Sequence, residues 1–152
     1  ESFSPNTNQV KESDNNSNLN ELLDKGKIIT KKTNQKITYH DSCYLGRGNK
    51  IYEAPRSIIN SISKNLIEMK RNKEKGLCCG AGGAQIFKES ENGTAEINIE
   101  RIKEVEKSNA EIVVTACPFC LTMINDGIKE EEIDSKIQVK DIVELLEENL
   151  ND

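Results

Sequence analysis

Apolar residues along this chain form short runs of two kinds, and the uninterrupted runs predict strands. The clearest run lies in 111–116, where Ile112, Val113 and Val114 follow one another as in a strand buried on both faces. Three further strands, the second of them weaker, are predicted over 36–40, 66–70 and 137–139. The pattern therefore predicts about four strands.

Between these runs, apolar residues recur every three or four positions, as on one face of a helix. In 95–108 the apolar positions are separated by charges, which predicts a surface helix. Pro55 and Pro118 each predict a helix start, because proline suits the first helical turn. A short helix over 19–25, ended by Gly26, is also expected. In a terminal helix, the side chains expected to face the core are Ile142, Val143, Leu145, Leu146 and Leu150.

Alternation of strands and helices predicts an α/β fold with a mostly parallel sheet and helices on both faces. Ligands of such folds sit outside the carboxyl ends of the strands. Cys43 comes just after the first predicted strand, Cys78 and Cys79 after the second, and Cys117 directly after the third. We therefore expect the cysteine loops to meet at this edge of the sheet.

The chain has 152 residues, enough for one domain with its own core. Residues 1–18 are rich in Asn, Ser and Asp, with only Phe3 and Val10 as sizeable apolar side chains. That is too little apolar surface to offset the entropy of ordering the segment. We expect a disordered lead-in over 1–18 and a single domain over 19–152.

The net charge and the lengths of the apolar stretches argue against nucleic acid as a partner and against membrane insertion. The formal net charge is -5 and the pI is near 5.1, which argues against nucleic acid. The longest apolar stretch, 112–120, is interrupted by Thr115 and Pro118 and is far shorter than the ~20 residues that span a bilayer. No membrane insertion by this chain is expected.

All five cysteines belong to one constellation, namely Cys43, Cys78, Cys79, Cys117 and Cys120. An odd number cannot be fully paired in disulfides within the chain, so we expect a reducing, cytoplasmic location, at most peripheral to a membrane redox complex. Converging thiolates are soft metal ligands, and five are one more than a tetrahedral zinc needs. The set therefore favours an iron–sulfur cluster.

Other interpretations of the same residues remain open. Structural zinc would make the domain a non-redox binding module, although the adjacent Cys78 and Cys79 suit that geometry poorly. The pair Cys117 and Cys120 at a helix N-terminus, which favours thiolates, would also suit a glutaredoxin-like dithiol. Inert buried cysteines would be scattered through the chain rather than gathered in glycine-rich loops.

Several neighbouring residues are candidates for a supporting role. Gly80, Gly82 and Gly83 do not form a nucleotide-binding fingerprint, and close backbone approach to a cluster explains them better. His40, the only histidine, stands at a strand end and is a candidate to contact a metal ligand or transfer protons, to have a purely structural role, or to bind the metal itself. Arg47 is a candidate to stabilise the negative charge of a cluster.

Three segments together resemble a known family. They are 39–47, which reads YHDSCYLGR, 78–83, which reads CCGAGG, and 117–120, which reads CPFC. They resemble the cysteine-rich CCG domain found in heterodisulfide reductase and in related iron–sulfur subunits of glycerol-3-phosphate, glycolate and lactate oxidising systems. The resemblance covers about 19–150, with Ser42 where the family usually has proline.

The resemblance implies that all five cysteines hold a [4Fe-4S] cluster of non-cubane type. It also implies electron transfer, with disulfide reduction as a further activity, inside a larger iron–sulfur oxidoreductase. Most members carry two such domains in tandem, and this chain resembles the second. The expected partners are therefore an upstream CCG half or redox subunits.

Overall fold

The computed structural model describes residues 15–89, 93 and 96–151, and the sheet at its centre has three parallel strands. They are β1 (Ile37–His40), β2 (Ile112–Thr115) and β3 (Gln138–Asp141), in the order β1-β2-β3. Ile37 pairs with Ile112, and Ile112 with Gln138. Because all three strands are parallel, their carboxyl ends lie at the same edge.

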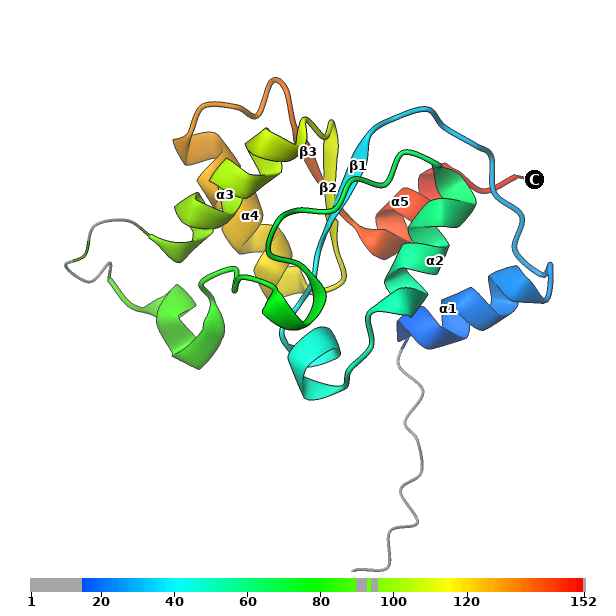
Figure 1. Cartoon of the computed structure of the whole chain (residues 1–152), viewed down its shortest axis with the longest axis horizontal. Coiled ribbons are helices and arrows are strands. Elements are labelled where there is room, and N and C mark those ends of the chain that lie inside the picture. The colour runs from blue at the N-terminus through cyan, green and yellow to red at the C-terminus, as the bar shows by residue number, and fades with distance from the viewer. Residues whose placement is uncertain (1–14, 90–92, 94–95, 152) are drawn as a thin grey trace, which may run out of the picture.

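Helices cover both faces of this sheet, as predicted (Figure 1). On one face lie α1 (Asn15–Asp24), α2 (Glu53–Ile62) and α5 (Ile142–Glu148). On the other lie α3 (Ile97–Ser108) and α4 (Pro118–Glu130). Side chains of β2 alternate between two cores: Ile112 and Val114 pack with α2 and α5, whereas Val113 packs with α3 and α4.

Several helix boundaries follow the sequence signals. Proline occupies the start of α4, and Gly26, with φ of 65°, ends the turn after α1. The helix α1 begins at Asn15, four residues before the predicted start, so part of the expected 1–18 lead-in is helical. The rest of that segment, 1–14, lies outside the described residues, and the 19–152 domain boundary stays a prediction.

The prediction of a strand over 66–70 is wrong. This segment pairs with β1 at a single bridge, where the Ile67 N–H donates to the Ile37 carbonyl oxygen at 2.8 Å. It then leaves the sheet, because the Glu68 carboxylate is bound to Arg56 and the Asn72 side chain donates to the Met69 carbonyl. These polar side-chain contacts take the place of the backbone hydrogen bonds that would have continued a strand.

Two apolar residues near the end of the chain were expected in the core and are not there. Val143 is 49% exposed and Leu150 is 40% exposed, whereas Ile142, Leu145 and Leu146 are buried. The helix α5 begins at Ile142 after an Asp141–Glu144 capping box, which turns position 143 away from the sheet.

Candidate metal centre

The carboxyl ends of β1 and β2 bring a histidine and two cysteine loops together. His40 is the last residue of β1, and Cys120 lies in the first turn of α4, directly after β2. Ligand atoms of His40, Cys79 and Cys120 all lie within 4.8 Å of one another. Among the described residues, this is the one group of three or more His, Cys, Asp and Glu side chains close enough to share a metal ion.

This trio is buried, with His40 1%, Cys79 4% and Cys120 2% exposed. A hydrogen bond with Cys120 lowers the pKa of Cys79, and contacts with His40 and the Ala81 backbone lower it further, against the effect of burial. The same Cys79 contact, together with burial, raises the pKa of Cys120. In this pair the contacts thus favour the ionised form of Cys79 over that of Cys120.

The remaining three cysteines are more exposed than the trio. Cys117, the N-cap residue of α4, is half-buried, and its nearness helps to raise the pKa of Cys120. Cys78 is half-buried, and its sulfur accepts the Gly80 N–H at 3.4 Å. Cys43 is exposed and lies three residues beyond His40, at the start of a π-helical turn over Tyr44–Gly48. All five cysteines are free thiols.

The glycine-rich loop bends close to these sulfurs. Gly80 has φ of 97°, and a Cβ there would lie 3.3 Å from Met123 Cε. A Cβ on Gly82 would lie 3.8 Å from Cys78 Sγ, whereas one on Gly83, with φ of 64°, would meet nothing within 4 Å. Backbone approach to sulfur thus explains Gly80, whose N–H meets Cys78 Sγ, whereas the 3.8 Å contact at Gly82 is an ordinary one that does not require glycine.

His40 is held by a residue that the sequence pattern did not reveal. The Nε–H of Arg101, on α3, donates to His40 Nδ1 at 3.0 Å. Burial lowers the pKa of His40, and the charge of Arg101 lowers it further, whereas contact with Cys79 opposes both. Burial and the charge of Arg101 thus favour the neutral imidazole.

A signal for Arg101 was present in the sequence. Arg101 and Glu104 are spaced i, i+3 and interleave with the apolar Ile102 and Val105, so all of them fall on the buried side of α3. The predicted helix over 95–108 is present as α3, and two of the charges that lie between its apolar positions are buried.

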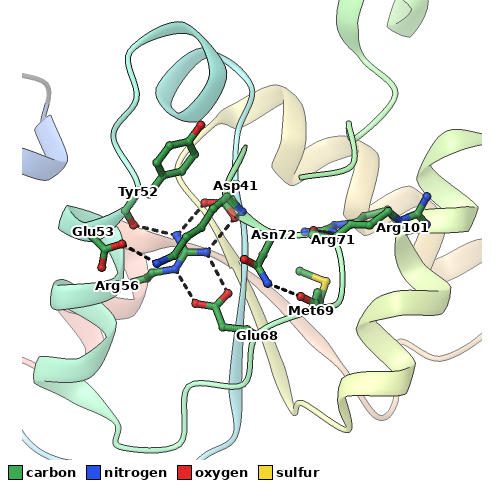
Figure 2. Close-up of polar contacts among 10 residues, drawn as sticks. Asp41, Tyr52, Glu53, Arg56, Glu68, Met69, Arg71, Asn72 and Arg101 are labelled. Carbon is green, nitrogen blue, oxygen red and sulfur yellow. Dashed lines mark hydrogen bonds and ion pairs between the residues drawn. The ribbon is translucent and has the colours of Figure 1, made fainter. Parts of the chain in front are cut away.

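A second buried cation anchors the loop that carries Cys43 (Figure 2). The Arg56 guanidinium donates to both Asp41 oxygens at 2.8 and 2.9 Å and to both Glu68 oxygens at 2.6 and 3.0 Å. Asp41 Oδ2 also accepts the Lys73 N–H at 2.7 Å. This clamp (Asp41, Arg56 and Glu68) joins α2 to the segments leading into two cysteine loops.

Arg47 is exposed and lies outside the buried trio. Its Nη2 donates to the Gly76 carbonyl at 3.2 Å, which ties the Cys43 turn to the start of the glycine-rich run. In the described part of the chain, no helix combines the length and the apolar character needed to cross a membrane.

The donor set fits a metal–sulfur group. It consists of soft sulfurs on loops at the carboxyl edge of the sheet, a Cys79 thiol whose pKa is lowered by its neighbours, and a loop that brings a backbone N–H to sulfur. The Cys78–Gly80 hydrogen bond has the form that orients a ligand thiolate.

Comparisons with known proteins extend this picture. The chain is 41% identical over 134 residues to the "Probable iron-sulfur-binding oxidoreductase FadF" of Bacillus subtilis, covering 87% of this chain and 19% of that protein. It is 41% identical over 135 residues to the "EtfAB:quinone oxidoreductase" of Syntrophomonas wolfei, covering 84% and 19%.

A third relative is archaeal. It is a subunit of the dihydromethanophenazine:CoB--CoM heterodisulfide reductase of Methanosarcina barkeri, 39% identical over 134 residues, covering 87% of this chain and 32% of that protein. The chain thus spans no more than about a third of these relatives. The family model described as "CCG: Cysteine-rich domain" matches residues 37–125, from β1 into α4 and across every cysteine loop, and the chain belongs to that family.

Proposed function

We propose that this chain is an iron–sulfur cluster-binding domain that carries electrons within a larger oxidoreductase. The observation that carries the proposal is the buried Cys79–Cys120 pair, with the other thiols on loops at the same sheet edge. Relatives named as iron–sulfur or heterodisulfide-reducing proteins support it, because their similarity covers all the cysteine loops.

The ligands in this proposal are Cys43, Cys78, Cys79, Cys117 and Cys120, holding a [4Fe-4S] cluster of non-cubane type. When bound, such a cluster supplies one-electron transfer. The Gly80, Gly82 and Gly83 backbone would direct N–H groups toward sulfur, and His40 and Arg47 would support ligands without binding iron.

Zinc is the competing occupant, because the buried trio is small enough for a single ion. A tetrahedral zinc holds sulfur at about 2.3 Å, so its ligand atoms lie within about 4 Å of one another. The fourth ligand would have to come from Cys43, Cys78 or Cys117, which lie outside that tight group. A multi-iron cluster is larger than one ion and fits more widely spaced thiols, which favours iron and sulfide.

Partners follow from the length of the relatives and from the surface of the site. The chain matches only 19% to 32% of those proteins, so the remaining redox centres would lie in other domains or subunits. Tyr44 and Phe119, each next to a cysteine, are 78% and 53% exposed. We propose that an upstream CCG half or a redox subunit covers these exposed side chains beside the cysteines. Disulfide reduction by the assembled protein belongs to the same proposal.

Metal content tests the proposal directly. After anaerobic reconstitution with iron and sulfide, the chain should hold about four iron and four sulfide, with thiolate-to-iron absorption. One zinc per chain and no sulfide would contradict it and support the binding module instead.

Three variants distinguish the residues that bind iron from those that only support the ligands. Cys79→Ser should lose or convert the cluster, because a hard oxygen poorly replaces a soft thiolate, and Cys43→Ser should do the same despite the exposure of Cys43. His40→Ala is the matched control and should retain iron. Full iron loss in His40→Ala would instead make His40 a ligand.

A further inference from the structure

Arg101 carries a charged side chain into the core of the protein, where packing alone would favour an apolar residue. The side chain is 0% exposed, and among the described residues its Nη2 has no hydrogen-bond partner. Leaving a charged donor unsatisfied in a core is costly, and an apolar residue of similar size usually serves stability as well or better. Stability alone therefore does not explain an arginine at position 101.

The contacts of Arg101 fix its guanidinium in one place. Nη1 donates to the Arg71 carbonyl at 2.7 Å and to Glu104 Oε2 at 2.8 Å. Glu104 is itself held from outside, because Arg71 Nε donates to its other oxygen at 2.6 Å. With Nη1 bound in this way, Nε is directed at His40 Nδ1 at 3.0 Å.

This contact determines which histidine nitrogen carries hydrogen. A guanidinium only donates, so the Nδ1 atom that faces it must present its lone pair. The ring hydrogen then resides on Nε2, the other nitrogen, and a ring nitrogen of His40 lies within 4.8 Å of Cys79 Sγ. The chain Arg101–His40–Cys79 thus has one direction of donation, from guanidinium to imidazole to sulfur.

We propose that Arg101 is a positioning residue, which acts through His40. By donating to Nδ1, Arg101 holds the imidazole as the Nε2–H tautomer and aims that N–H at Cys79 Sγ. The hydrogen bond withdraws electron density from this sulfur, and donation to ligand sulfurs is one of the means by which a protein sets the potential of an iron–sulfur cluster. The consequence for the potential rests on the proposed function, whereas the tautomer does not.

The tautomer can be measured without metal. His40 is the only histidine in the chain, so long-range 1H–15N correlation of its ring in the reduced, metal-free protein needs no assignment by mutation. We expect an unprotonated Nδ1 and a protonated Nε2. A spectrum with hydrogen on Nδ1, or on both nitrogens at neutral pH, would overturn the inference.

Variants test whether Arg101 is the cause. Arg101→Met removes the donor, so the Nδ1 resonance should move toward that of a lone pair without a hydrogen bond. The preference for the Nε2–H tautomer should fall about tenfold or more, because hydrogen bonds to charged groups contribute about 1.5–3 kcal/mol. Arg101→Lys retains a cationic donor and should restore part of the shift. An unchanged Nδ1 resonance in Arg101→Met would refute the role.

Arg71→Lys is the matched control. It perturbs the same Glu104 carboxylate but belongs to a side chain that is 41% exposed, so the His40 spectrum should not change. If Arg101→Met does not fold, the wild-type spectrum and Arg101→Lys still decide the question.

The loaded chain tests the effect on sulfur. With iron and sulfide reconstituted, Arg101→Met should shift the midpoint potential to a more negative value, whereas Arg71→Lys should stay near the wild-type value. An unchanged potential despite an altered His40 spectrum would refute the link to Cys79. If the chain takes up no iron at all, the proposed function fails, and the metal-free spectra still decide the role of Arg101.

Discussion

Gly80 shows most directly how single residues shape the site. Its φ of 97° is a conformation that residues with a Cβ rarely adopt, and its N–H points at Cys78 Sγ. Two other glycines in the same loop provide natural comparisons. Gly83 has positive φ but open space around it, and Gly82 has neither a positive φ nor a close neighbour. Substitutions at these three glycines can therefore distinguish the cost of backbone strain from the cost of steric contact.

We predict that alanine substitutions in this loop differ in a fixed order. Gly80→Ala should reduce the free energy of unfolding by about 1–3 kcal/mol, because it adds backbone strain and a close contact to Met123. Gly83→Ala should cost about 1 kcal/mol from strain alone, and Gly82→Ala less than about 0.5 kcal/mol. Urea denaturation of the three variants measures this order, and equal losses would contradict it.

The clamp of Asp41, Arg56 and Glu68 acts between elements. It joins α2 to the loop after β1 and to the 66–70 segment, and the Arg56 guanidinium also lies 5.3 Å from the centre of the Tyr39 ring. The Arg56 and Asp41 side chains are 5% and 3% exposed. Hydrogen bonds to Asp41 and Glu68 raise the pKa of Arg56 despite the burial that acts against its charge. The two carboxylates thus stabilise the charged form of Arg56, which burial alone would disfavour.

Arg56→Met should lower the free energy of unfolding by about 3–5 kcal/mol, because it leaves the buried Asp41 carboxylate without its cation. The matched control is Glu53→Gln, which breaks the exposed Lys73–Glu53 pair on the same helix and should cost less than about 1 kcal/mol. Chemical denaturation with both variants measures the difference. Similar losses would mean that the clamp contributes no more than a surface pair.

At the scale of the whole molecule, the site lies at an edge of the sheet and is only partly covered. Cys79 and Cys120 are buried, but Cys43 and the neighbouring Tyr44 are exposed, as is Phe87 in the glycine-rich segment, at 81%. The relatives extend far beyond the part matched by this chain. A covering domain or subunit would shield these exposed groups.

A bound cluster should therefore last longer in the larger assembly. In air, the isolated chain should lose its cluster absorbance several-fold faster than the chain joined to an upstream CCG half or bound to its redox subunit, because binding to the loaded state stabilises that state. The measurement is the decay of absorbance with and without the partner, with complex formation checked by size-exclusion chromatography. If the cluster absorbance decays equally fast with and without the partner in a formed complex, the partner does not protect the cluster.

Local residue patterns were sufficient to predict most of the elements. The run Ile112–Val114, the proline at the start of α4 and the glycine after α1 act over a few residues, so their effect can be deduced without knowing the fold. The cysteine spacing likewise predicted that thiols would meet at the carboxyl ends of parallel strands. Cys79 and Cys120 do meet there, next to His40.

Only the tertiary structure decided what depends on partners distant in the sequence. The 66–70 segment leaves the sheet because Glu68 meets Arg56, twelve residues away, and Arg101 is buried because it meets His40, sixty-one residues away. The pKa of Cys79 is lowered because contacts with Cys120 and His40, both about 40 residues away in the sequence, act on its sulfur. Such pairings depend on how the elements pack, whereas helix starts and strand runs depend on local sterics, so only the latter can be deduced from the sequence.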